Sequence, residues 1–252
     1  MAGLKPTGKR PKRRARTSTV ADVFRILHTR ILTMELPPGH QMSEAEIARD
    51  LGVSRQPVRD AVYRLAQLGL LVVRPQSGTH VSTISTAAVE RARFLRTAIE
   101  TETVREAAAK LDAAGLARLS ALIDAQQKAV DAGDHAEFHQ LDDAFHLEIC
   151  HAAGRGFSWD RIAEQKAHMD RVRVLTLDVG KARALAEHRT ILAALEAGDG
   201  ALAERSMRAH LAQITALVEV ARSTRPDAFG EETPRGHDPS IDKVSAAVSR
   251  AT

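Results

Sequence analysis

Four residues in the C-terminal two thirds of the chain have the types and spacing of a divalent metal site. Asp142 and His146 are four positions apart, so on a helix both side chains project from one face, one turn apart. His188 and His210 each stand among apolar residues with helical spacing. A carboxylate and imidazoles that converge from different helices of a bundle hold divalent metals. Spacing alone does not exclude two other roles for these histidines, packing in a hydrophobic core or capping a helix.

A second polar set, near position 55, has the side chains that contact DNA. Arg55, Gln56 and Arg59 are types that reach base edges and phosphates, and they stand near the predicted N-terminal end of a helix. That helix is predicted to start at Ser54, whose hydroxyl would cap it. Its apolar stripe, at positions i, i+3, i+4 and i+7, is Val58, Ala61, Val62 and Leu65. An exposed charged helix face is usually only solvated, so the surrounding elements must decide.

The elements upstream complete a helix-turn-helix. Ser43 and Glu46 form an S-x-x-E capping box, which predicts a short helix over residues 44–51. Gly52 follows as the left-handed residue that turns one helix into the next. Further upstream, apolar residues with helical spacing predict another helix over residues 20–32.

Downstream, two short β-favouring runs predict a hairpin. Residues 70–74 and 79–82 flank Pro75-Gln76-Ser77-Gly78, a glycine-bearing turn. Three helices followed by a hairpin make a winged helix, so the order of elements over residues 18–82 predicts a winged helix-turn-helix DNA-binding domain.

Charge is divided unevenly along the 252 residues. Residues 1–82 hold 14 Lys/Arg against 6 Asp/Glu, whereas the remainder holds 22 against 26. This asymmetry indicates that the N-terminal part meets nucleic acid. Residues 1–17 are predicted to be a basic disordered tail. Aromatic residues make up 3% of the chain, which disfavours base-stacking recognition of single strands and favours double-stranded DNA.

The region from 87 to 223 is predicted to be an all-α antiparallel bundle, which makes the protein mainly α. Breaks near 113–115, 132–134, 153–154, 179–180 and 198–200 divide the region into about six helices. Residues 83–86 are interpreted as a linker with Ser85 or Thr86 as a helix cap, and 224–252 as a flexible tail.

The winged-helix segment resembles a known family. Leu51–Val62, Leu68–Leu70 and the wing at Gly78–Val81 resemble the GntR family of bacterial transcription factors. The resemblance implies that the recognition helix reads the major groove and that the wing tip approaches the minor groove. By this resemblance and by residue type, the expected DNA-binding residues are Arg49, Ser54, Arg55, Gln56, Arg59, Gly78 and His80. At His80 the chain departs from the aromatic residue that is commoner in the family.

The helical region resembles the FCD effector domain of the FadR subfamily. The matching motifs are Asp142–His146, Glu187–Asp199 and Met207–Leu211. The resemblance implies that Asp142, His146, His188 and His210 bind a divalent ion, Zn, Ni, Co or Mn, and it disfavours a fatty-acyl effector. It also implies that Arg96 lines the effector cavity. The alternative for Arg96 is an i,i+4 ion pair with Glu100.

Together these features predict a ligand-responsive transcriptional regulator, expected to repress a catabolic operon. A homodimer would bind a pseudo-palindromic operator, and a small carboxylate effector would bind at the metal. Two alternatives are a purely structural metal and a metalloenzyme that carries a winged helix, although no H-E-x-x-H or nucleophile motif supports an enzyme. A single cysteine, Cys150, fits a cytoplasmic protein, and no stretch approaches the ~20 apolar residues of a membrane span.

Overall fold

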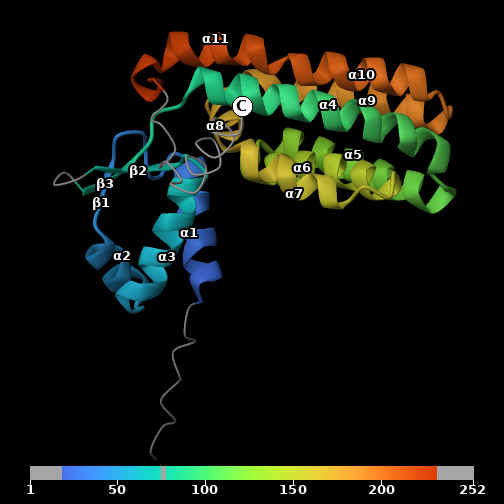
Figure 1. Cartoon of the computed structure of the whole chain (residues 1–252). Helices are drawn as coiled ribbons and strands as arrows, with labels where there is room; N and C mark the ends of the chain where they lie inside the picture. The colour runs from blue at the N-terminus through green and yellow to red at the C-terminus, as the bar shows by residue number, and fades with distance from the viewer. Residues whose placement is uncertain (1–18, 75–77, 232–252) are drawn as a thin grey trace, which may run out of the picture.

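The N-terminal part of the protein is a winged helix-turn-helix, which we call the head (Figure 1). The computed structural model describes residues 19–74 and 78–231. The elements of the head are α1 (Val20–Leu32), β1 (Gln41–Met42), α2 (Glu44–Leu51), α3 (Arg55–Gln67), β2 (Leu71–Arg74) and β3 (Gly78–Val81). The strands form an antiparallel sheet in the order β1-β3-β2. The predicted winged helix is therefore confirmed.

Local capping explains where the head helices begin and end. Thr19 and Asp22 form a capping box at the start of α1, and the Ser43 hydroxyl accepts the Glu46 N–H at the start of α2. Gly52 ends α2 with φ 65°, the left-handed conformation that the turn requires. Ser54 occupies the N-cap position of α3, but its side chain makes no capping hydrogen bond, so that expectation is wrong. The reason is Pro57, which occupies the third helical position and has no N–H to donate to the Ser54 hydroxyl.

The apolar faces of α1, α2 and α3 meet in one core beneath the sheet. The stripe predicted on α3 is buried there, with Val58, Ala61 and Leu65 completely inaccessible. Burial of such side chains is the main source of stability in a domain of this size. The core consists of Val23, Leu27, Ile31, Met42, Ala48, Val58, Ala61, Val62, Leu65, Leu70, Leu71, Val81 and one residue from outside the head, Ala167.

The remaining helices form an all-α bundle, as expected, but with eight α-helices among the described residues instead of about six. They are α4 (Thr86–Lys110), α5 (Ala113–Ala132), α6 (His135–Ala152), α7 (Phe157–Gln165), α8 (Ala167–Leu175), α9 (Leu177–Glu196), α10 (Gly200–Ala212) and α11 (Ile214–Thr224).

Two of the predicted breaks are displaced, to Asp112 and to Thr176, and two breaks were not predicted. Asp112 caps α5 by accepting the Gly115 N–H, so Gly115 lies in the first turn of that helix. Gly180 lies in the first turn of α9, where its N–H is bonded to the Thr176 carbonyl. The two extra breaks, at Lys166 and Gln213, contain neither glycine nor proline, the residues that mark a break in sequence.

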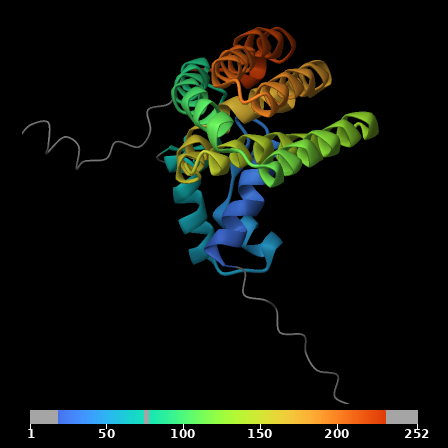
Figure 2. The ribbon, with the colours of Figure 1, turned by 90° about the vertical axis from the view of Figure 1, so that its right-hand side faces the viewer.

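The bundle lies beside the head, with its long helices running away from it (Figures 1 and 2). Helix α4 packs along α10, α5 packs against α6 and α9, and α9 packs against α10. The largest fully buried side chains of this core include Phe145, Leu119, Ile149, Ile191 and Leu195. Three helices, α6, α9 and α10, thereby place their inner faces around the same interior space.

The connection between head and bundle is buried. Ile84, in the predicted linker 83–86, is fully inaccessible and pairs in parallel with Phe229. Ser85 is the N-cap of α4, one of the two predicted caps. The prediction of a flexible tail over 224–252 is wrong for its first eight residues, because a short 3₁₀ helix (Pro226–Ala228) and the Phe229 pairing hold this segment against the linker. The basic tail predicted for 1–17 and the residues after 231 lie outside the described residues.

Within residues 19–74 and 78–231, no helix combines the length and the apolar character that a membrane span requires.

Candidate metal centre and DNA-binding surface

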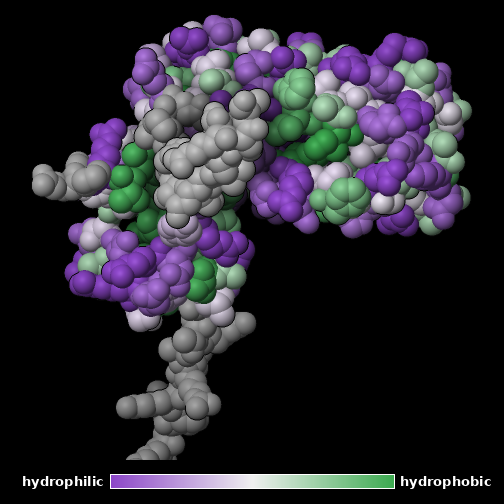
Figure 3. Space-filling model, viewed as in Figure 1, coloured by the Kyte–Doolittle hydropathy of each residue, from purple (hydrophilic) through white to green (hydrophobic). Residues whose placement is uncertain are grey.

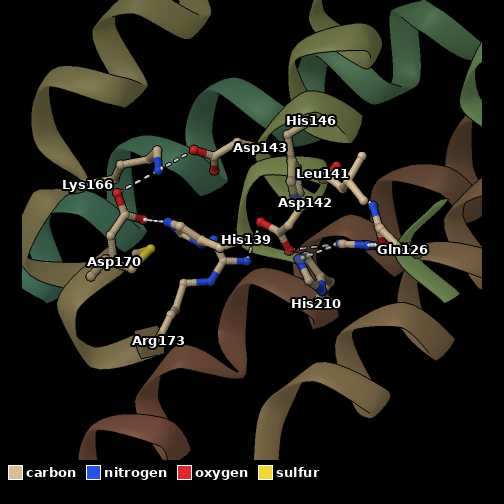
Figure 4. Close-up of polar contacts among 12 residues, drawn as sticks. Gln126, His139, Leu141, Asp142, Asp143, His146, Lys166, Asp170, Arg173 and His210 are labelled. Carbon is tan, nitrogen blue, oxygen red and sulfur yellow. Dashed lines mark hydrogen bonds and ion pairs between the residues drawn. The ribbon is translucent and has the colours of Figure 1, made fainter. Parts of the chain in front are cut away.

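The four predicted metal ligands meet inside the bundle, and Figure 4 labels three of them, Asp142, His146 and His210. Asp142 and His146 come from α6, His188 from α9 and His210 from α10, and all four are buried. One ligand atom from each residue lies within 4.8 Å of the others. The structure therefore brings the complete predicted set together.

Helix periodicity and one tight turn produce this convergence. The i,i+4 spacing puts Asp142 and His146 on one face of α6. Gly198, with φ 65°, and Asp199, which caps α10 by accepting the Leu202 N–H, turn the chain between α9 and α10. The two helices pack together, and His188 Nε2 lies 3.3 Å from His210 Nε2.

Each imidazole is oriented by an oxygen acceptor on its other ring nitrogen. His188 Nδ1 lies 2.8 Å from Gln126 Oε1, and His210 Nδ1 lies 2.9 Å from Glu187 Oε2. His146 Nδ1 lies 2.5 Å from Glu100 Oε2. Metal-binding histidines typically engage such partners, which fix the ring orientation and leave the second nitrogen for the metal.

Three polar atoms of the cluster have no hydrogen-bond partner within the described part of the chain: Asp142 Oδ1 and both ring nitrogens of His146, of which Nδ1 still lies within ion-pair distance of Glu100. Asp142 Oδ1 lies 3.6 Å from His188 Nε2, which is too far for a hydrogen bond. Buried polar atoms without partners destabilise a fold by about 1–3 kcal/mol each. A divalent cation would satisfy Asp142 Oδ1 and His146 Nε2, so the residues present fit a metal.

The protonation states also suit metal binding. Burial lowers the pKa of His188 well below its usual value, and burial lowers the pKa of His210 as well, so both rings are neutral at pH 7. Burial alone would raise the pKa of the Asp142 carboxyl, but Arg173 and the nearby histidines hold this pKa well below its usual value. The site therefore offers an anionic carboxylate and neutral imidazoles, as metal ligands must be.

Arg173 on α8 is a site residue that the sequence reasoning missed. Its Nη2 lies 2.5 Å from Asp142 Oδ2, while its Nη1 is buried without a hydrogen-bond partner among the described residues. Only 13% of its side chain is exposed. Gln126, Glu100 and Glu187 were also not assigned to the metal site, although Glu187 stands next to His188 in the quoted motif.

A cavity of about 240 Å³ opens beside the cluster. Arg96, Arg173, Glu187 and His210 contribute its polar lining, and α11 contributes apolar side chains. Arg96 lines this cavity, and its guanidinium is paired with Glu100 at 2.5 and 3.3 Å, the ion pair given above as the alternative. Both partners are at most 3% exposed, so Arg96 is held rigidly.

Asp143, which follows Asp142 on α6, forms an ion pair. Its carboxylate lies 2.8 Å from Lys166 Nζ, and its side chain is 29% exposed. Lys166, which is itself buried, also contacts Asp170 at 2.6 Å (Figure 4). The end of α7 and the start of α8 are thus tied to α6 next to the candidate metal ligands.

The expected DNA-contacting residues of the helix-turn-helix are exposed. Arg55, Gln56 and Arg59 lie on the first turns of α3, and Arg49 lies in the last turn of α2. Arg59 is 65% exposed and lies 3.7 Å from Glu44, a weak surface pair. Such side chains remain available to a partner, at a helix end whose dipole favours anions.

Of the other three expected residues, Ser54 is exposed at the N-cap of α3, and Gly78 and His80 lie on the wing strand β3. Gly78 is exposed with φ 85°, a conformation that favours glycine, and a Cβ there would come within 3.2 Å of Gln41 Nε2. His80 is half-buried and pairs with Val72 and Gln41 in the sheet. The wing tip, residues 75–77, lies outside the described residues.

Comparison with known proteins agrees with this architecture. The model of bacterial regulatory proteins of the gntR family matches residues 19–81, and that of the FCD domain matches residues 92–213. The HTH-type transcriptional repressor RspR of Escherichia coli K12 is 36% identical over 212 residues, which cover 83% of this chain and 93% of RspR. An uncharacterized HTH-type transcriptional regulator from an unstable DNA locus of Streptomyces ambofaciens is 38% identical over 214 residues, 84% of this chain and 89% of that protein. The chain belongs to the GntR family.

This GntR-family protein shares its fold with solved structures of the same family. Escherichia coli McbR/YncC superposes with a TM-score of 0.69 at 23% identity, over 80% of this chain and 97% of that one. A putative GntR regulator from Rhodococcus sp. RHA1 gives 0.66 at 21% identity, over 79% and 97%. The FCD domain is consistent with the FadR subfamily. The relatives are transcriptional regulators, and this protein is a DNA-binding transcriptional regulator, not an enzyme.

Proposed function

We propose that this GntR-family regulator is a homodimeric repressor that senses a small carboxylate at a divalent metal. The metal ligands would be Asp142, His146, His188 and His210. The observation that supports this most directly is the buried cluster itself, with two unpartnered ligand atoms beside a cavity that contains an unpartnered arginine nitrogen.

One carboxylate and three imidazoles suit Zn, Ni, Co or Mn. When bound, the ion would supply positive charge and open coordination positions at the cavity wall. The chain's own residues prepare that position: Gln126, Glu100 and Glu187 orient the imidazoles, and Arg173 keeps Asp142 ionised.

The effector would be a small organic acid. A cavity of about 240 Å³ accommodates a compact molecule but not a long acyl chain. Arg173 Nη1 lacks a partner and would pair with the carboxylate, whereas Arg96 already has Glu100 and would add charge from the cavity wall. A relative from Paenarthrobacter nicotinovorans, 31% identical over 204 residues, is named a probable D-xylose utilization operon transcriptional repressor. This name supports control of a catabolic operon here.

DNA binding would use the exposed end of α3 in the major groove, with Arg55, Gln56 and Arg59 as readers. Arg49 and Ser54 would position the helix on the backbone, and Gly78 and His80 would approach with the wing. One such head makes few phosphate contacts, whereas two heads held at a fixed spacing bind a pseudo-palindrome together.

The dimer would form through the bundle. Figure 3 shows hydrophobic side chains gathered over α4 and the neighbouring α6–α7 pair. The exposed large hydrophobic side chains of these helices are Phe94 and Phe157, each 70% exposed, and Leu95, 37% exposed. A second copy would bury these residues, and Phe94→Asp is expected to yield a monomer in analytical ultracentrifugation with the helical content unchanged.

The decisive experiment combines metal analysis with a thermal-shift screen of small carboxylates, run on metal-loaded and on chelated protein. We expect that at least one carboxylate raises the melting temperature of the metal-loaded wild type and leaves that of the chelated protein unchanged. His188→Ala should lose both the metal and that response, whereas His151→Ala, an exposed histidine of α6, should keep both. A metal that stabilises the fold while no carboxylate binds would instead support a purely structural metal.

A further inference from the structure

Helix α8 lies between the head and the bundle and contacts both (Figure 1). Ala167, in its first turn, belongs to the hydrophobic core of the head. Met169 and Val172 pack in a separate cluster with α11 and Ile84 of the connection. A nine-residue helix moves as one body, so a displacement at either end of α8 reaches the other.

Two arginines of α8 point in opposite directions. Residues two positions apart on a helix are separated by about 200° around its axis. Arg173 faces the bundle, where it contacts Asp142 at 2.5 Å. Arg171 faces the head, where its Nη2 donates to the Ser82 carbonyl at 2.7 Å and its Nη1 to the Ser82 hydroxyl at 3.3 Å.

Ser82 is the residue through which Arg171 holds the head. It directly follows the wing strand β3, and its hydroxyl donates to the Gly69 carbonyl at 2.7 Å, just after α3. Its N–H donates to the Leu70 carbonyl. A shift of Ser82 therefore acts on both DNA-contacting parts of the head, the recognition helix and the wing.

A second residue of α8 holds the other end of the connection. His168 is buried, and its Nδ1 accepts the backbone N–H of Ser85 at 3.3 Å. Ser85 caps α4, the longest helix of the bundle. The segment from Ser82 to Ser85 is thus attached to α8 at both of its ends.

The Arg171 guanidinium has no carboxylate partner in the described part of the chain, and its side chain is completely buried. Its Nε has no hydrogen-bond partner there, and burial lowers its pKa to about 10, so it still carries its charge at pH 7. A buried charge that is held only by serine oxygens is poorly stabilised. Loss of the Ser82 contacts would leave this charge without a partner, so Ser82 is expected to follow Arg171 when α8 moves.

We infer that α8 couples the candidate metal centre to the DNA-binding head, with the Arg173–Asp142 contact as its input and the Arg171–Ser82 contact as its output. This inference rests on the proposed function, because it takes Asp142 as a metal ligand. A cation at Asp142 Oδ1 would draw negative charge from the carboxylate that Arg173 contacts through Oδ2 and so weaken that contact, and the change would be passed along α8 to Ser82. Coupling of this kind is reciprocal, so binding of DNA at the head changes the affinity of the metal centre by the same factor.

The test uses Zn²⁺ alone as the probe and requires neither operator nor effector. Hydrogen–deuterium exchange is measured by mass spectrometry on the full chain, with chelator and with Zn²⁺. In the wild type we expect exchange in residues 78–85 to change by about fivefold or more, the lower range of ordinary allosteric coupling. The Ser85 amide, which donates to His168, reports the movement directly.

Arg171→Met has a similar length without the charge, a replacement that buried sites usually tolerate. It should bind Zn²⁺ normally and change exchange in α6 and α8, but no longer in residues 78–85. Arg173→Met removes the contact with Asp142 and with it a positive charge beside the metal ligands, so Zn²⁺ should bind more tightly than in the wild type. Exchange in residues 78–85 should again not respond to the metal. Arg189→Met, an exposed arginine of α9, is the control and should respond as the wild type does.

Three outcomes separate the two proposals. Failure of the wild type to bind Zn²⁺ overturns the proposed metal centre and the coupling with it. Zn²⁺ that binds and protects only α6, α9 and α10 leaves the metal centre standing and overturns the coupling. An undiminished response of residues 78–85 in both Arg171→Met and Arg173→Met also overturns the coupling.

Discussion

The recognition surface of the head and the candidate metal centre of the bundle use polar side chains in opposite environments. Arg55, Gln56 and Arg59 are exposed above an apolar core, and little of the fold depends on them. Asp142 and His188 are fully buried; Asp142 is held by Arg173, which is 13% exposed, and His188 by Gln126, which is fully buried. Function and stability are therefore separable in the head and joined in the bundle.

The largest expected effect is a loss of stability when a buried residue of the candidate metal centre is replaced. Asp142→Ala leaves Arg173 without its carboxylate, and breaking a buried ion pair by removing one partner costs about 3–5 kcal/mol. We expect this loss in the free energy of unfolding of the chelated protein, measured by urea denaturation. The double variant Asp142→Ala/Arg173→Met should recover part of it. A loss below about 1 kcal/mol in the single variant would refute the structural role assigned to this pair.

The matching change in the head should affect binding alone. Arg59→Ala is expected to weaken binding to a DNA fragment that the wild type recognises by about 1–3 kcal/mol, measured by fluorescence anisotropy. Its unfolding free energy should stay within about 0.5 kcal/mol of wild type, because Arg59 is exposed and its pair with Glu44 is weak. Arg25→Ala, an exposed arginine of α1, serves as the control. Equal losses in the two variants would show that α3 is not the reading helix.

The same comparison explains what could be predicted from sequence. Helices α1 and α2 match their predicted ranges because their ends are marked locally, by Ser43 and Gly52 among others. The four candidate ligands were predicted from residue type, helical spacing and family resemblance, and they do converge. The exposed residues of α3 could be predicted from helical periodicity alone, because the apolar stripe identifies the buried face and the opposite face is then exposed.

What could not be predicted depends on contacts between helices distant in sequence. Arg173 reaches Asp142 across 31 positions, and Gln126 reaches His188 across 62. The boundaries of α8 were missed because Lys166 and Thr176 end helices without a glycine or proline signal. The tail after Thr224 looked flexible by composition, yet Phe229 is ordered by its pairing with Ile84, a tertiary contact.

A smaller effect, on metal affinity, is expected from Glu187, which contacts the candidate ligand His210. Glu187→Gln keeps the shape of the group that orients His210 but removes its charge, so metal affinity should fall by about tenfold. Competition with a chromophoric chelator measures this. Glu148→Gln is a matched control, since Glu148 is similarly exposed and pairs with Arg118 away from the cluster. If both variants bind the metal as the wild type does, Glu187 has no role in orienting a ligand.

The smallest effect is a pH dependence that the centre should impose on the chelated protein. The pKa of His188 is depressed in the folded state by burial, so below the ordinary value of 6.5 the unfolded chain binds a proton that the folded chain does not. Its contribution to stability is complete above about pH 6.5 and is lost as the pH falls toward the folded-state pKa. This amounts to about 1 kcal/mol between pH 7.5 and pH 6. His188→Gln should flatten the stability–pH curve by this amount, and His151→Gln, at an exposed position, should not. If the stability–pH slope of His188→Gln equals that of the wild type, the fold does not keep the His188 imidazole neutral. The candidate metal centre would then be solvated, as the recognition surface of the head is.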